Sequence, residues 1–74
     1  MFREQGWVAS FFSNEGAEPP HLHIRKGGGE AKFWLGRVRL ASSRDLKVSE
    51  LAEAEQLVRK HAASALEKWH EHFD

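Results

Sequence analysis

The sequence predicts an α+β fold in which three or four antiparallel strands form a small meander and one long C-terminal helix packs across it. Two observations support this prediction. Within residues 21–40, three short stretches alternate between apolar and polar residues with a period of two, which is typical of strands with one covered face. From residue 49 onward, apolar residues recur at spacings of three and four, which is typical of an amphipathic helix. We expect the strands within residues 7–40 and the helix over about residues 50–73.

A first strand is expected directly after Gly6, where Trp7–Ser13 is rich in aromatic and small residues. This run ends at Asn14–Gly16, whose composition is typical of a turn. Pro19-Pro20 then prevents a helix, because each proline ring fixes φ and removes a backbone N–H donor. A second strand can therefore begin at His21.

The clearest element of the sequence is a β-hairpin around Gly27–Gly29. These glycines accept the positive φ of a tight turn, and an alternating stretch lies on each side of them, at His21–Arg25 and Glu30–Leu35. Pairing the apolar sides of the two stretches brings their polar residues and Trp34 onto one common surface. We call this surface the hairpin face; it comprises His21, His23, Arg25, Glu30, Lys32 and Trp34.

One more short strand is expected at Arg37–Leu40, antiparallel to the second arm of the hairpin. Ser49 is then a suitable N-cap for the helix, and neither Gly nor Pro interrupts the chain up to Asp74. The helix must bury its apolar stripe on the apolar side of the sheet, because nothing else in the chain can cover that side. The stripe consists of Leu51, Ala54, Val58, Ala62, Ala65, Trp69 and Phe73, with Leu57 and Leu66 beside it.

Length and composition exclude several classes of protein. A chain of 74 residues leaves room for one domain, residues 1–74, and the absence of Cys excludes a disulfide scaffold, a cysteine-based zinc site and a cysteine nucleophile. No apolar run approaches the roughly 20 residues of a membrane span, and the N-terminus lacks a secretory pattern. We therefore expect a cytoplasmic protein that does not contact membranes.

The net charge of zero conceals an uneven distribution along the chain. Residues 21–48 contain seven basic and two acidic residues, a net charge of +5, whereas residues 1–20 carry −2 and residues 49–74 carry −3. In one interpretation the basic middle simply faces an acidic helix within the domain. In the other it offers a basic surface to phosphate groups or to an acidic protein. A pI near 7.0 counts against tight nonspecific binding of nucleic acid.

His21 and His23 are the main candidates for chemistry. Two imidazoles two residues apart on a strand lie on one face with Cβ atoms about 7 Å apart, as two metal ligands or an acid–base pair require. Without a metal, one histidine would act as base and the other as acid, with Arg25 or Lys32 stabilising a phosphoryl oxyanion. The plainer alternative is that both are polar residues on a solvated sheet face.

A metal site needs at least a third ligand, and Glu30, His70 and His72 are the options in the sequence. With only two histidines clearly on one face, we expect no tight metal site and no cofactor.

Three segments resemble a known family: Asn14–Ile24 with its Pro-Pro-His-Leu-His core, Glu30–Leu35, and Trp69–Phe73. They are similar to the small bacterial domain of unknown function 4160 family over nearly the whole chain. The resemblance implies a neighbouring gene for a small protein of the domain of unknown function 2442 family, an arrangement like that of toxin–antitoxin pairs. It implies no catalytic residues.

Two main hypotheses for function follow. The first is a binding module of a toxin–antitoxin-like pair that presents the basic hairpin face to a small protein encoded nearby, to RNA or to DNA. The second is a small metal-independent ribonuclease in which His21 and His23 share the acid–base work. A histidine-based metal-binding protein and a homodimer are kept as further alternatives. The binding residues we expect are His21, His23, Arg25, Lys32 and Trp34.

Overall fold

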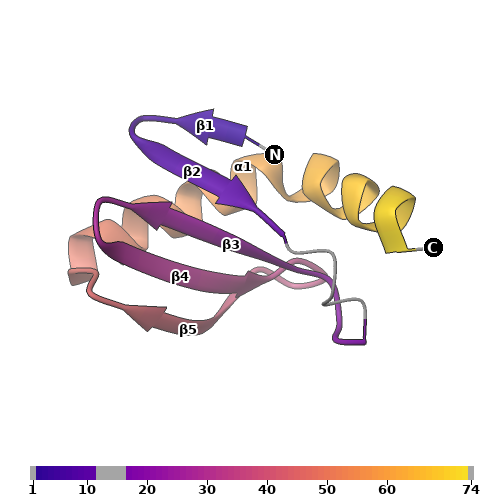
Figure 1. Cartoon of the computed structure of the whole chain (residues 1–74), viewed down its shortest axis with the longest axis horizontal. Coiled ribbons are helices and arrows are strands. Elements are labelled where there is room, and N and C mark those ends of the chain that lie inside the picture. The colour runs from indigo at the N-terminus through magenta and orange to yellow at the C-terminus, as the bar shows by residue number, and fades with distance from the viewer. Residues whose placement is uncertain (1, 12–16, 74) are drawn as a thin grey trace.

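The computed structural model, which describes residues 2–11 and 17–73, shows a five-stranded antiparallel sheet with one long helix across a single face (Figure 1). The strands follow one another in the sheet in chain order, as in a meander. This confirms the predicted α+β class with its long C-terminal helix, with five strands in place of three or four. The elements are β1 (Phe2–Glu4), β2 (Trp7–Ser10), β3 (His21–Lys26), β4 (Gly29–Trp34), β5 (Arg39–Arg44) and α1 (Val48–Phe73).

Strand β1 lies outside the residue range expected for strands. It pairs antiparallel with β2 through a two-residue turn in which Gln5 and Gly6 both have positive φ, 55° and 85°. Positive φ at both central residues matches the right-handed twist of a hairpin. The sequence did not suggest this hairpin because Gln lacks the preference of Asn and Asp for this conformation. The turn expected at Asn14–Gly16 lies outside the described residues.

The hairpin of β3 and β4 forms as expected, and its register places His23 opposite Lys32, with Gly27 at a positive φ of 59° in the turn. Strand β5, in contrast, begins two residues later than expected and continues to Arg44. Its pairing with β4 shifts between Lys32 and Phe33, so that Ala41 is an extra residue and the simple alternation is lost.

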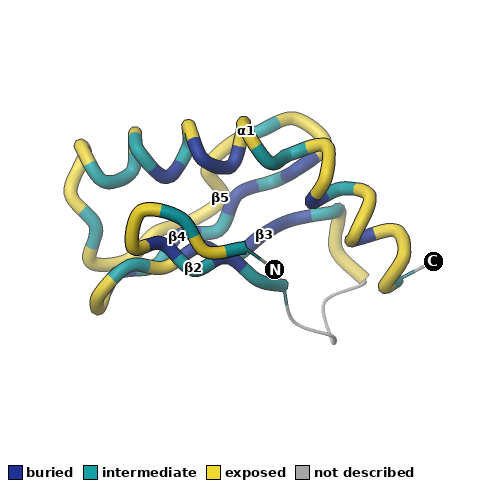
Figure 2. The backbone as a smooth tube through the Cα atoms, turned by 90° about the horizontal axis from the view of Figure 1, so that it is seen from above, coloured by how far each residue is buried: buried dark blue, intermediate teal, exposed yellow. Residues whose placement is uncertain are grey.

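The core lies between the sheet and α1, which packs over β3 and β4. Figure 2 shows α1 on one side of the sheet, with buried residues both along the strands and along the helix. The expected helix stripe forms this contact, and the members of it that are only half-buried are Leu51, Ala62, Leu66 and Phe73. The buried apolar residues are Trp7, Ala9, Leu22, Ile24, Ala31, Phe33 and Leu35 of the sheet region and Ala54, Leu57, Val58, Ala65 and Trp69 of the helix.

The start of α1 differs from the expected cap. The helix begins at Val48, and the backbone N–H of Lys47 donates a 2.8 Å hydrogen bond to Oε1 of Glu50. Lys47 therefore takes the N-cap position and Glu50 the third helical position, which is half of a capping box, while Ser49 lies inside the first turn. Among the described residues, α1 lacks the apolar length that crossing a bilayer requires.

Candidate functional site

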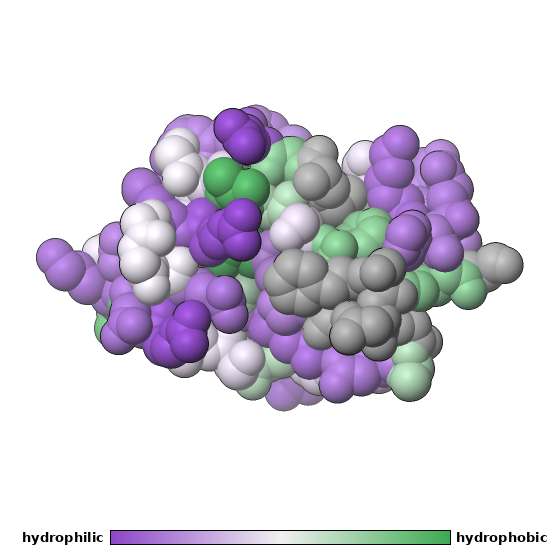
Figure 3. Space-filling view, viewed as in Figure 1, coloured by the Kyte–Doolittle hydropathy of each residue, from purple (hydrophilic) through white to green (hydrophobic). Residues whose placement is uncertain are grey.

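The side of the sheet turned away from α1, called the outer face below, carries the polar side chains of the strands. Cross-strand register arranges them in three rows that run across the strands. Hydrophilic side chains are spread over this face from β1 to β5, around a small apolar spot (Figure 3). The first row is Arg3, Val8, Arg25, Glu30 and Arg44; the second is Ser10, His23, Lys32 and Ser42; the third is His21, Trp34 and Arg39, of which His21 also contacts Trp69 of α1.

The structure brings most of the expected binding residues together on the outer face. Arg25 is exposed, and His23, Lys32 and Trp34 are half-buried in adjacent rows. The position of His21 differs, because its side chain has no exposed surface.

His21 is buried by aromatic rings and by the chain that precedes β3. Its ring lies 4.8 Å from Trp69, 5.8 Å from Trp34 and 5.3 Å from His23, measured between ring centroids. Its Nδ1 is 2.9 Å from the carbonyl oxygen of Pro19, and a carbonyl only accepts, so Nδ1 carries the proton. The expectation that His21 stands on a solvated face is wrong. Strand alternation decides the side to which a residue points, but it does not decide what covers that side.

This burial changes what the two histidines can do together. Their rings are neighbours, with planes 81° apart, but only His23 has exposed surface. An acid–base pair requires both imidazoles to reach the substrate. The arrangement therefore favours a structural role for His21 and leaves His23 as the histidine that a ligand can contact.

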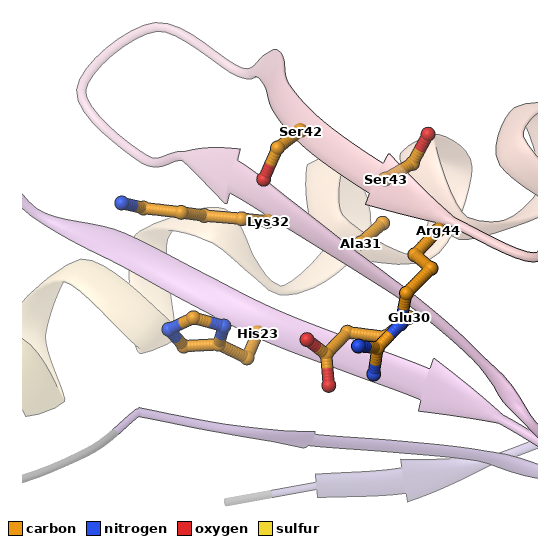
Figure 4. A pocket seen from close by; sticks show the side chains of 7 residues that line it. All are labelled: His23, Glu30, Ala31, Lys32, Ser42, Ser43 and Arg44. Atoms are coloured by element: carbon orange, nitrogen blue, oxygen red, sulfur yellow. The ribbon is translucent and has the colours of Figure 1, made fainter.

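A hollow of about 130 Å³ lies on the outer face between β3, β4 and β5 (Figure 4). Its polar lining is formed by His23, Lys32, Ser42, Ser43 and Arg44, which can donate hydrogen bonds, and by Glu30, which accepts them. The volume is below that of pockets for drug-sized ligands, which reach about 300 Å³ or more. A hollow of this volume has room for one small chemical group of a larger molecule.

Two interactions hold Lys32 in place. Its Nζ lies 2.6 Å from Oε1 of Glu18 and 4.8 Å from the centre of the Trp34 ring, an ion pair and a cation–π contact. The Lys32 side chain is only 19% exposed. Glu18 offsets much of its charge, and Glu30 stands opposite Arg44, the other permanent cation of the hollow.

The possible third metal ligands do not gather around the two histidines. Glu30 lies in the arginine-rich first row, and His70 and His72 are exposed near the end of α1. In the described part of the chain, no group of three or more His, Asp or Glu could hold a metal ion.

Sequence reasoning did not place six residues of the outer face: Arg3, Val8, Ser10, Arg39, Ser42 and Arg44. Arg44 had been counted among the basic residues of the middle segment, but the expected last strand ended before it. No sequence pattern pointed to Arg3, because β1 was not expected. None pointed to Ser42, because Ser is a weak strand former.

Comparison with protein families gives one match, over residues 6–70, to the family described as domain of unknown function (DUF4160). No curated protein and no solved structure matches the chain.

Proposed function

The chain belongs to the family described as domain of unknown function (DUF4160), and from that premise we propose that it is a binding module that receives anionic groups on the outer face of its sheet. The observation that carries the proposal is the hollow in which His23, Lys32, Ser42 and Arg44 surround one small space. Three neighbouring strands hold these four residues side by side, and a ligand that engages Lys32 would replace its ion pair with Glu18.

The resemblance of the sequence supports a role as one member of a toxin–antitoxin-like pair. In such a pair the partner is a small protein encoded nearby, and the outer face is the surface offered to that protein or to a nucleic acid. A cytoplasmic location fits this role. The ribonuclease alternative is less favoured, because His21 is buried and its Nδ1 proton is committed to Pro19.

The test measures binding and cleavage together. Fluorescence anisotropy would follow three titrations of the purified protein: with a labelled RNA oligomer, with labelled poly-L-glutamate and with the neighbouring small protein. We expect at least one of them to bind and Arg44→Glu to weaken that binding by about tenfold or more, because it reverses a charge in the hollow. Lys68→Glu, the same change at an exposed helix position, should have little effect.

Absence of binding to all three probes would contradict the proposal. Cleavage of the RNA that His23→Ala abolishes would favour the ribonuclease instead. The parent protein and each variant should first be compared by circular dichroism, so that loss of binding is not confused with loss of the fold.

A further inference from the structure

We propose that the outer face binds single-stranded RNA laid across the strands, with successive phosphate groups along the row of Arg3, Arg25 and Arg44. This inference rests on the proposed function and deepens it by naming the class of partner.

The three arginines form a line that suits an extended polyanion. Arg3 lies opposite Val8, Val8 opposite Arg25, Arg25 opposite Glu30, and Glu30 opposite Arg44, so the row crosses all five strands. With strands about 4.8 Å apart, neighbouring arginines are about 10 Å apart and the outer two about 19 Å apart. All three arginines are exposed. A single small anion cannot span this distance, whereas a chain of phosphates can.

Arginine is also the residue that matches phosphate best. Its planar guanidinium donates two parallel hydrogen bonds to one phosphate and keeps its charge at every physiological pH. A hollow on each side of Arg25 opens along the row: one is lined by Arg3, Val8 and Arg25, the other by Glu30 and Arg44. Phosphates seated there would contact the guanidinium groups without any movement of the strands.

The second row provides the reason to choose RNA. His23 and Ser42 lie two residues along their strands from Arg25 and Arg44, a separation of about 7 Å, and Ser10 lies at the same separation from Val8 of the arginine row. Hydroxyl and imidazole groups both donate and accept hydrogen bonds, as the ribose 2′-hydroxyl does. The third row places Trp34 beside Ser10, His23 and Ser42. The Lys32 ammonium lies over the Trp34 ring, and a base could stack on this ring once Lys32 turns away from it toward a phosphate.

Glu30 is the one carboxylate in the arginine row, and its position leads to a prediction about the strength of RNA binding. It stands opposite both Arg25 and Arg44, where it would repel a phosphate bound between them. Binding of moderate affinity is therefore expected from the wild-type protein. Replacing Glu30 by Gln should tighten the binding of RNA.

The experiment is a fluorescence anisotropy titration of a short fluorescein-labelled oligouridylate over a range of salt concentrations. Arg25→Ala should weaken binding about tenfold and reduce the slope of log K against log salt by about 0.7, the value for one lost contact to a single-stranded phosphate. Arg44→Ala should act in the same way and serves as a second variant if Arg25→Ala is unstable. Arg37→Ala is the matched control, because it removes the same charge from an exposed turn outside the row.

Two further measurements separate RNA from other partners. Glu30→Gln should bind the oligouridylate about threefold more tightly, while Glu67→Gln, on the exposed side of α1, should not change it. The corresponding deoxyribonucleotide should bind more weakly than the RNA. Equal binding of the two would overturn the choice of RNA.

The failures of the two proposals can be told apart. If poly-L-glutamate or the neighbouring protein binds in an Arg44-dependent manner and the RNA does not, the inference on RNA fails and the binding module stands. If the RNA binds but Arg25→Ala and Arg44→Ala affect it no more than Arg37→Ala, the arginine row is overturned as its site. If no probe binds, the proposed function fails as well.

Discussion

His21 shows how one residue can have the expected position and an unexpected environment. It lies in the outer-face register opposite Trp34, yet Trp69 and the Pro19-Pro20 segment enclose it. A buried imidazole with a backbone hydrogen bond contributes to folding as a core residue does.

We therefore expect His21→Ala to lower the free energy of unfolding by about 2–4 kcal/mol, through the cavity and the lost hydrogen bond to Pro19. His23→Ala should cost less than about 1 kcal/mol, because this ring is partly solvated. Urea denaturation followed by circular dichroism measures both. Ile24→Ala, which empties a fully buried position, is the reference and should resemble His21→Ala. A His23→Ala variant as unstable as Ile24→Ala would show that His23 is structural too.

At the scale of elements, α1 depends most on the aromatic residue near its end. Trp69 is 3% exposed and its ring lies 4.8 Å from His21, 5.4 Å from Phe11 and 4.1 Å from Phe73. Trp69→Ala should reduce stability by about 3 kcal/mol or more, because it leaves a large cavity between the helix and the start of β3. The measurement is the melting temperature of Trp69→Ala compared with that of Lys68→Ala, a variant at the exposed neighbouring residue. A Trp69→Ala variant that melts within a few degrees of the parent would contradict the packing.

The turn between β3 and β4 offers a second test, with a control in the adjacent residue. A Cβ at Gly29 would come within 2.5 Å of the Asp45 carbonyl oxygen and would overlap the Leu46 side chain, whereas a Cβ at Gly28 meets nothing within 4 Å. Gly29→Ala should therefore cost about 1–3 kcal/mol, because the connection between β5 and α1 must move. Gly28→Ala should be close to neutral, since Gly28 does not have positive φ. Equal stability of the two variants in urea denaturation would contradict this tight approach.

At the scale of the whole molecule, two carboxylates tie the sheet to the helix. Glu53 of α1 accepts hydrogen bonds from Nε1 of Trp7 and Nζ of Lys26, and Glu4 of β1 lies 2.6 Å from Nζ of Lys60 and 2.8 Å from Nε2 of His61. The Trp7 hydrogen bond, and then that of Lys26, lowers the pKa of Glu53 below its ordinary value of 4.5. The hydrogen bonds of Lys60 and His61 lower the pKa of Glu4 in the same way.

These lowered pKa values predict loss of stability in acid. The unfolded chain binds protons at the ordinary pKa of 4.5, so the contribution of Glu4 and Glu53 is complete above that pH. It is lost as the pH falls from 4.5 through the lowered pKa values of the folded state. The double variant Glu4→Gln/Glu53→Gln should have a flatter profile of melting temperature against pH in this range. Glu67→Gln/Glu71→Gln, on exposed helix positions, should keep the parent's slope; the same slope in both double variants would contradict the assignment.

The sequence by itself determined the two-layer plan, and for a physical reason. The plan follows from three patterns: period-two alternation at residues 21–25 and 30–35, the three glycines between these stretches, and the helical stripe from Leu51 onward. Each pattern involves only residues that are close together in the sequence. These local patterns were sufficient for the existence of the central hairpin, the long helix and the surface shared by His23, Lys32 and Trp34.

Only the tertiary structure decided the edges of the sheet and the environment of each side chain. Strand β1 depends on two positive-φ residues that composition did not single out, and the end of β5 depends on pairing with β4 across a bulge. The arginine row needs all five strands in register, and the burial of His21 needs Trp69, 48 positions away in the sequence. Alternation assigns a side chain to one face of a strand, but what stands over that face comes from distant parts of the chain, and no local pattern records it.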